Sequence, residues 1–160
     1  MISTTKLVGA VVGMAVVVLV GAGCGDSYGG GSPAKSNSGT ASVDVADSNL
    51  GKILVDGNGR TLYLFEADTG TRSACNGACA SAWPPLTSKG SPSAGTGVTA
   101  AKLGTAKRDD GTVGVTYNGH PLYTFAGDKA PGQATGQGSD GFGAEWYVLS
   151  AAGTAIESGE

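Results

Sequence analysis

Short runs of alternating or β-branched apolar residues recur along residues 41–160, and turn residues separate them. A period of two is typical of a half-buried β-strand. We therefore predict strands at residues 42–46, 52–55, 61–65, 101–107, 112–117, 121–125, 146–149 and 154–156. Asn118-Gly119 is a strong signal for a two-residue hairpin. Asp56-Gly57-Asn58-Gly59 predicts another reverse turn, so residues 61–65 are expected to return as the partner strand of residues 52–55 in a first hairpin.

The remaining segments predict loops and one short helix. Residues 75–83 are rich in alanine and run into Pro84-Pro85, which favours a helix of one or two turns that ends there. Residues 87–97 and 126–143 are rich in Gly, Ser and Pro and read as loops. No long amphipathic pattern is present, so the predicted class is mostly β and antiparallel.

A ten-residue pattern occurs twice, as GRTLYLFEAD at Gly59–Asp68 and as GHPLYTFAGD at Gly119–Asp128. Five positions match without gaps, and a Trp-containing segment follows each copy at Trp83 and Trp146. We therefore expect a single β domain with tandem repeats near residues 50–86 and 111–149. The two pseudo-symmetric repeats would pack as a small sandwich or barrel, with the short helix near Cys75–Trp83.

The N-terminus has the pattern of an export signal. Lys6 precedes a fourteen-residue apolar run, which is shorter than the ~20 residues of a membrane-spanning helix and fits a signal-peptide core. Small residues end the run before Cys24, so residues 1–23 are predicted to be a signal peptide. Residues 24–40 read as Cys24 plus a flexible linker, and residues 41–160 as the domain.

The segment around Cys24 resembles a bacterial lipoprotein signal, in which the Cys becomes the lipidated first residue. Gly21 departs from that pattern, which usually has an aliphatic residue there. An ordinary secretory signal and an uncleaved anchor are the alternatives. The lipoprotein interpretation implies acyl chains that hold the domain on the extracytoplasmic face of the cell membrane.

Composition narrows the class of partner. The chain has 10 Lys and Arg against 13 Asp and Glu, a formal charge of −3, and no block of basic residues. Nucleic-acid binding needs a clustered basic surface, so nucleic acid is not an expected partner.

The repeated motif resembles a known family. Tyr63-x-Phe65-x-x-Asp68 and Tyr123-x-Phe125-x-x-Asp128 are similar to the Y-x-[FWY]-x-x-D repeat of predicted bacterial lipoproteins, the "secreted repeat of unknown function" family. The resemblance implies a location in the cell envelope and a tandem β repeat. It brings no established activity, so it implies no catalytic residue.

The motif residues allow two interpretations. In the first, each Asp caps a turn by accepting backbone N–H bonds, and each Tyr hydroxyl finds a polar partner at the rim of the domain. In the second, pseudo-twofold packing gathers aromatic rings and carboxylates into a pocket for a sugar, a cation or a small aromatic molecule. The candidate ligand-binding residues are Tyr63, Phe65, Asp68, Trp83, Tyr123, Phe125, Asp128 and Trp146.

Cys75 and Cys79 are an even pair in an exported chain, which favours a disulfide. A redox-active dithiol is the alternative, although the spacing is C-x₃-C. Two Cys and the single His120 fall short of a closed zinc site, and a turn His is expected to face solvent. Arg108-Asp109-Asp110-Gly111 reads as a solvent-exposed turn, and Asp109-Asp110 does not read as a pair of catalytic carboxylates.

No cofactor, metal or catalytic set is therefore expected. The most consistent interpretation is a membrane-anchored, extracytoplasmic, non-catalytic binding module of the bacterial cell envelope. Its expected partners are the membrane, through the lipid anchor, and an envelope protein or a small ligand. The alternatives are an envelope redox or electron-transfer accessory that uses Cys75 and Cys79, and a polysaccharide hydrolase.

Overall fold

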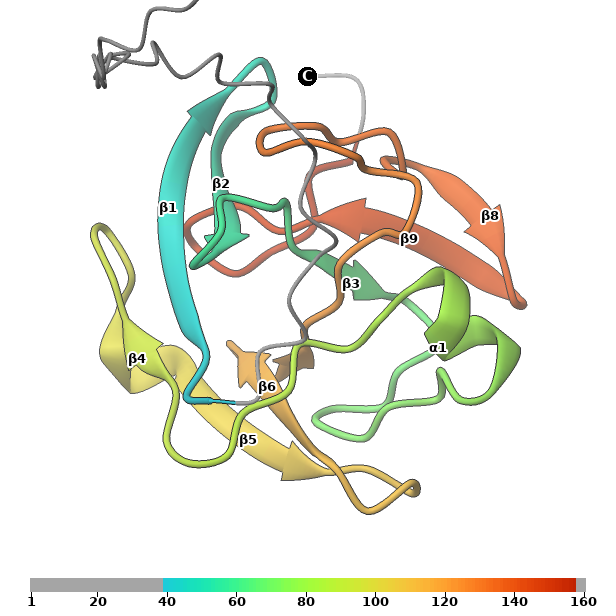
Figure 1. The fold of residues 1–160 in the computed structure, drawn as a ribbon. Coiled ribbons are helices and arrows are strands. Elements are labelled where there is room, and N and C mark those ends of the chain that lie inside the picture. Colours follow the sequence, from blue (N-terminus) through green and yellow to red (C-terminus); the bar gives the residue numbers. More distant parts are fainter. Residues whose placement is uncertain (1–38, 158–160) are drawn as a thin grey trace, which may run out of the picture. The chain divides into compact units, whose positions relative to one another are not determined.

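The structure is a computed structural model that describes residues 39–157 (Figure 1). The predicted signal peptide, Cys24 and the linker up to residue 38 lie outside the described residues. Within residues 39–157, no helix is long and apolar enough to cross a membrane.

Nine short strands, one α-helix and one 3₁₀ turn make up the described domain, which is mostly β as predicted. The strands form three sheets of three strands each, in the orders β2-β1-β4, β3-β9-β8 and β5-β6-β7, and the sheets of residues 39–157 do not close into a barrel. The elements are β1 (Ser42–Ser48), β2 (Gly51–Asp56), β3 (Tyr63–Phe65), α1 (Ala78–Ala82), β4 (Ser93–Ala94), η1 (Ala100–Lys102), β5 (Leu103–Lys107), β6 (Val113–Tyr117), β7 (His120–Pro121), β8 (Ser139–Gly141) and β9 (Ala144–Val148).

Local turn chemistry accounts for the predicted hairpin at Asn118-Gly119. Both residues have positive φ, 51° and 85°, as a two-residue turn of this kind requires, and Tyr117 pairs with His120 across it. Pro121 lies in β7 at the edge of its sheet, where a missing N–H donor breaks no ladder.

The first hairpin differs from the prediction. Residues 61–65 were expected to pair with β2, but only the bridge between Val55 and Thr61 joins these two segments. β2 pairs instead with β1, and β3 pairs with β9, which comes more than 80 residues later in the chain. The expected strand at residues 101–107 also begins with the 3₁₀ turn η1 before β5.

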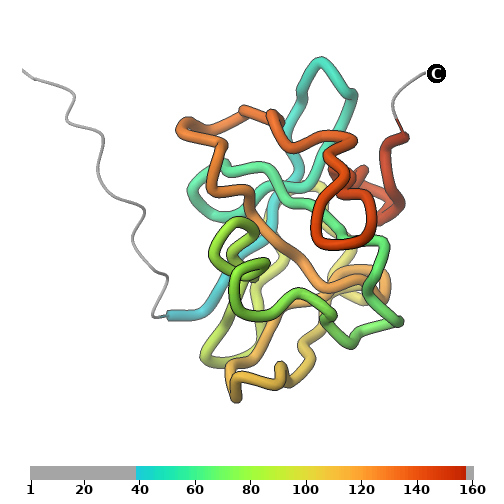
Figure 2. Tube along the Cα trace, turned by 90° about the vertical axis from the view of Figure 1, so that its right-hand side faces the viewer, coloured from blue at the N-terminus to red at the C-terminus, as the bar shows by residue number. Residues whose placement is uncertain are grey.

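The two repeats meet at their tyrosines. The N–H of Tyr63 donates to the carbonyl of Tyr123 at 2.8 Å, and the N–H of Tyr123 donates to the carbonyl of Tyr63 at 3.0 Å. Figure 2 shows the chain near residue 120 passing through the middle of the domain between segments of the first repeat. The tyrosine pair therefore lies on a local pseudo-twofold axis.

Each repeat also makes a pair of backbone hydrogen bonds to the other repeat. Leu149 of the second repeat accepts from the N–H of Leu54 at 2.9 Å and donates to the carbonyl of Leu62 at 3.1 Å. Leu86 of the first repeat makes the matching pair of bonds with Val115 and Leu122, both at 2.8 Å. These bonds explain why residues 61–65 do not continue the pairing with β2. Backbone groups of the second repeat form hydrogen bonds with them instead.

β3 separates two hydrophobic clusters, because successive side chains of a strand point to opposite faces. Leu64, with Leu62 just before the strand, packs into one cluster, and Tyr63 and Phe65 pack into the other. All four side chains are buried, so this short strand is covered on both faces.

Candidate functional site

The hydroxyls of the motif tyrosines bind the carboxylates of the opposite repeat. Tyr63 donates to Oδ2 of Asp128 at 2.7 Å, and Tyr123 donates to Oδ2 of Asp68 at 2.8 Å. Each Tyr therefore binds the Asp of the other repeat and not the Asp five residues after it. We call these two contacts the cross-repeat lock.

Local backbone bonds hold both carboxylates in place. Each Asp donates its N–H to the carbonyl three residues earlier at 3.1 Å, which forms the turn after the motif strand. The second carboxylate oxygen then accepts a backbone N–H from the following loop, from Ala74 to Asp68 at 2.7 Å and from Thr135 to Asp128 at 2.9 Å. The turn-capping interpretation of the aspartates is confirmed, whereas the tyrosine hydroxyls find their partners inside the domain.

Four aromatic rings form a continuous stack that also alternates between repeats. Phe65 lies 4.1 Å from Trp146, Trp146 lies 4.0 Å from Trp83, and Trp83 lies 4.3 Å from Phe125, measured between ring centroids. The two indoles are nearly parallel, at 3°. We call these four rings the aromatic stack.

The tyrosines pack edge-on against the aromatic stack. Tyr63 meets Trp83 at 5.2 Å and Tyr123 meets Trp146 at 5.1 Å, the edge-to-face arrangement that aromatic quadrupoles favour. All eight candidate ligand-binding residues are thus brought together, as pseudo-twofold packing predicted. They contact each other closely, and each tyrosine binds the Asp of the opposite repeat and meets a Trp ring edge-on.

Burial controls the ionisation of the cross-repeat lock. Burial is the main cause that raises the pKa of the Tyr63 hydroxyl well above its ordinary value, and the bond to Asp128 adds to this effect. Burial also raises the pKa of Tyr123, and it raises the pKa of the Asp68 carboxyl. Both hydroxyls therefore stay protonated at neutral pH, which suits hydrogen-bond donors and not general bases.

The two halves of the lock differ in their outer partners. Ser73 lies 2.7 Å from the Tyr123 hydroxyl and accepts from the guanidinium of Arg108 at 2.6 Å. In the other half, the Tyr63 hydroxyl accepts the N–H of Gly136 at 3.3 Å. Because a phenol has one proton, the Tyr123 proton goes to the carboxylate and the Ser73 hydroxyl donates to the phenol oxygen.

Arg108 was placed by the sequence in a solvent-exposed turn, and that part of the prediction is wrong. The residue is 6% exposed, and its guanidinium also donates to the carbonyl of Cys75 at 2.7 Å. It reaches across from the second repeat to the loop of the first, as Arg60 reaches the carbonyl of Phe125 at 2.9 Å in the opposite direction. A charged residue beside a turn gives no local signal for such long-range burial.

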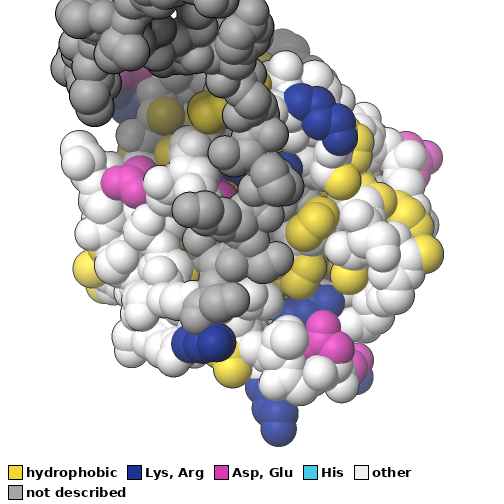
Figure 3. All heavy atoms as spheres, viewed as in Figure 1, with side chains coloured by type: hydrophobic (Ala, Val, Ile, Leu, Met, Phe, Trp, Pro, Cys, Tyr) yellow, Lys and Arg dark blue, Asp and Glu magenta, His cyan; other side chains and the backbone are white. Residues whose placement is uncertain are grey.

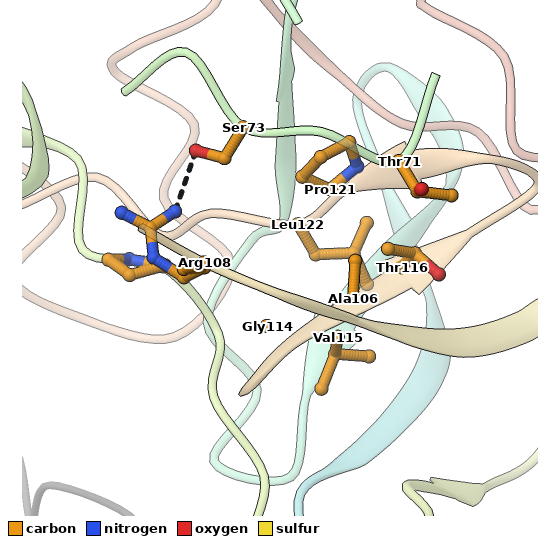
Figure 4. Close-up of a pocket in the computed structure, with 10 residues that line it drawn as sticks. Thr71, Ser73, Ala106, Arg108, Gly114, Val115, Thr116, Pro121 and Leu122 are labelled. Atoms are coloured by element: carbon orange, nitrogen blue, oxygen red, sulfur yellow. Dashed lines mark hydrogen bonds between the residues drawn. The ribbon is translucent and has the colours of Figure 1, made fainter. Parts of the chain in front are cut away.

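A small hollow lies beside Ser73 and Arg108 (Figure 4). Its volume is about 10 Å³, room for roughly one water molecule. Pro121, Leu122 and Thr116 line it together with these polar side chains. The hollow is therefore too small for the sugar or aromatic ligand considered from the sequence.

The structure also places the cysteines, the histidine and the acidic turn that the sequence singled out. Cys75 and Cys79 form a disulfide that joins α1 to the preceding loop, and both residues are buried. His120 is half-buried in β7, so it does not simply face solvent. Asp110 forms the predicted exposed turn, where the side chain and N–H of Thr112 lower the pKa of its carboxyl.

Within residues 39–157, the structure shows neither a metal-ligand cluster nor, on the face drawn in Figure 3, a basic block. No group of three His, Cys, Asp or Glu side chains within residues 39–157 is placed to hold a metal. The face drawn in Figure 3 carries its described Lys and Arg side chains apart from one another, without a single basic block.

A family model described as "Secreted repeat of unknown function" matches the chain twice, at residues 44–87 and 104–150, which together make up more than half of its length. The two matches contain the two motif copies and the two Trp segments that form the lock and the stack. No curated protein and no solved structure matches the chain.

Proposed function

This chain belongs to the secreted repeat family of unknown function, and we propose that it is a non-catalytic binding module anchored on the extracytoplasmic face of the cell membrane. The description of the family supports a secreted location. The lipid anchor rests on the sequence around Cys24, which lies outside the described residues.

The cross-repeat lock is the observation that carries the non-catalytic part of the proposal. The two motif copies supply two tyrosine hydroxyls and two aspartate carboxylates, and these groups bind each other. In Asp68 and Asp128, one carboxylate oxygen accepts a hydrogen bond from a tyrosine and the other accepts one from a loop N–H. The motif therefore stabilises a rigid scaffold, and recognition falls to the surface of the domain.

Two measurements test this proposal. Mass spectrometry of the mature protein from its own membranes should find an N-terminal acylated Cys24, and Cys24→Ala should release the protein from the membrane fraction. Photo-crosslinking of the full-length protein in its envelope, from several exposed positions, should capture a discrete protein partner. An unmodified Cys24 would refute the anchor, and the absence of any adduct from every position would refute the binding role.

Electron transfer is a second candidate, and the aromatic stack favours it. Transfer of one electron from Trp83 or Trp146 to an external one-electron oxidant would give an indole radical cation beside a tyrosine about 5 Å away. The tyrosine would return the electron and pass its hydroxyl proton to the bound aspartate, leaving a tyrosyl radical and a neutral carboxylic acid.

Flash photolysis tests that candidate with a photogenerated ruthenium(III) complex as the one-electron oxidant. Electron transfer through the stack predicts a tyrosyl radical that Tyr63→Phe/Tyr123→Phe abolishes. A radical that stays on the half-buried Tyr147 in both proteins would exclude it. The buried disulfide gives this candidate no support, because thiol exchange needs access to a sulfur atom.

The hydrolase interpretation gains no support from the described residues. Glycoside hydrolysis needs two carboxylates with room between them for a sugar. Asp68 and Asp128 instead flank a filled core of aromatic rings, and both accept hydrogen bonds from protein groups.

A further inference from the structure

The tip of the β8–β9 hairpin breaks two local rules that the rest of the domain obeys. The hairpin turns through Phe142 and Gly143, which have φ of 62° and 97°. Positive φ at both positions selects Asn, Asp or Gly, and a bulky residue there is a strained exception. The β6–β7 hairpin uses the preferred Asn118 at the same position.

Phe142 does not use this conformation to pack inside the protein. The residue is 54% exposed, the largest exposure of a large hydrophobic residue within residues 39–157. Figure 1 shows the turn between β8 and β9 at the outer edge of the domain. A strained backbone that presents an aromatic ring to solvent has no stabilising role in the isolated domain, and strained residues of this kind concentrate at functional sites.

The same hairpin places like charges opposite each other. Asp140 of β8 pairs directly with Glu145 of β9, an arrangement that destabilises an antiparallel ladder. Glu66 adjoins them, because its N–H donates to the carbonyl of Glu145 at 3.1 Å. The charge near Phe142 is therefore negative.

The hairpin is held rigidly despite these costs. The indole Nε1 of Trp146 donates to the carbonyl of Gly141 at 3.1 Å, one residue before the tip. Trp146 is fully buried in the aromatic stack, so this bond fixes the base of the turn to the core of the domain. A rigid support lowers the entropy lost when an aromatic anchor enters a partner.

We propose that the β8–β9 hairpin tip docks a protein partner through Phe142, with a basic segment of that partner lying over Asp140, Glu145 and Glu66. This inference rests on the proposed binding role and names its surface and the chemistry of its partner. An exposed aromatic ring is the residue class that dominates binding energy at interfaces, and the carboxylates set the sign of the complementary charge. The same carboxylates oppose docking on an anionic lipid surface.

The first test uses a defined probe, a fluorescein-labelled peptide of alternating lysine and leucine. Its anisotropy is measured with the full-length protein in non-ionic detergent, with empty micelles as the blank. Phe142→Asn should weaken binding about tenfold. The same substitution should raise the thermal midpoint by about 4 °C, because it removes the strained conformation of a bulky residue. A gain in stability together with a loss of binding is not expected of a residue with a structural role.

Charge variants and a second peptide complete the test. Asp140→Asn and Glu145→Gln should each weaken binding and flatten its dependence on salt, while the exposed Asp109→Asn should change neither. A peptide of alternating glutamate and leucine should not bind. Equal binding by Phe142→Asn and the unmodified protein, or equal binding of the acidic peptide, would overturn the inference.

Photo-crosslinking in the native envelope separates this inference from the proposed function. A crosslinker at position 142 should capture a protein, in competition with the lysine–leucine peptide, and a crosslinker at position 113 serves as the exposed control. An adduct of lipid mass at position 142, or capture only from other positions, overturns the hairpin assignment and leaves the binding role standing. The absence of adducts from all positions overturns both.

Discussion

The replacement Tyr63→Phe tests one half of the cross-repeat lock. It removes the hydroxyl that donates to Asp128 at 2.7 Å and leaves the ring, with its contacts to Trp83, in place. Asp128 is only 4% exposed, so water cannot easily replace the lost donor. The N–H of Gly136 loses its acceptor as well.

The expected loss of stability follows from these contacts. A hydrogen bond to a charged group contributes about 1.5–3 kcal/mol, and a buried acceptor left without a partner loses its solvation too. We therefore expect Tyr63→Phe to lower the free energy of unfolding by about 2–3 kcal/mol. Tyr123→Phe should lower it by only about 1 kcal/mol, because water can reach the half-buried Asp68.

Urea unfolding at neutral pH with the disulfide intact measures both changes, and an unchanged slope shows that they reflect the native contacts. A double-mutant cycle with Asp128→Asn gives the coupling between the two repeats. The control is Tyr147→Phe, which removes an exposed bond to Glu145 and should change stability by less than about 0.5 kcal/mol. The reasoning fails if Tyr63→Phe is as neutral as this control, or if Tyr123→Phe is the more damaging of the two.

Three further predictions follow from the same core. The raised pKa values of Tyr63 and Tyr123 mean that stability is fully present below their ordinary pKa and is lost as the pH rises above it, by about 1.4 kcal/mol per pH unit for each. In a spectrophotometric titration these two tyrosines should ionise only as the domain unfolds, and early ionisation of both would contradict the burial argument. Replacing Cys75 and Cys79 by Ala should cost about 2 kcal/mol through loss of the small loop, measured by denaturant unfolding, whereas an unchanged midpoint would show that the bridge is dispensable. Gly136→Ala should destabilise the domain by more than 1 kcal/mol, because its Cβ would lie 2.5 Å from an indole ring, and a thermal midpoint equal to that of the unmodified protein would show that the stack can move aside.

Much of the secondary structure could be predicted because its causes are local. The alternation at residues 42–46 and the β-branched run at 52–55 became β1 and β2, and the Asn118-Gly119 turn formed as its chemistry requires. The alanine-rich segment gave α1. Each of these features depends on neighbours within a few residues, which a pattern along the chain records directly.

Partner choice could not be predicted in the same way. The sequence predicted β2 as the neighbour of residues 61–65, but β9 provides a longer ladder. The backbones of Leu86 and Leu149 each form hydrogen bonds with the other repeat. The duplication indicated that a symmetric contact exists. It did not show which Tyr binds which Asp, because the two partners of each bond are more than 50 residues apart.

The sequence by itself determined the mostly β class, the tandem repeat, the family and the eight residues that meet at the centre. Only the tertiary structure decided that those residues bind and pack against one another, that Arg108 is buried, and that Phe142 is exposed at a strained turn. The physical reason is the range of the forces involved. Turn preference and alternation act between chain neighbours, whereas burial, ring stacking and the pairing of Tyr with Asp depend on groups that only folding brings together.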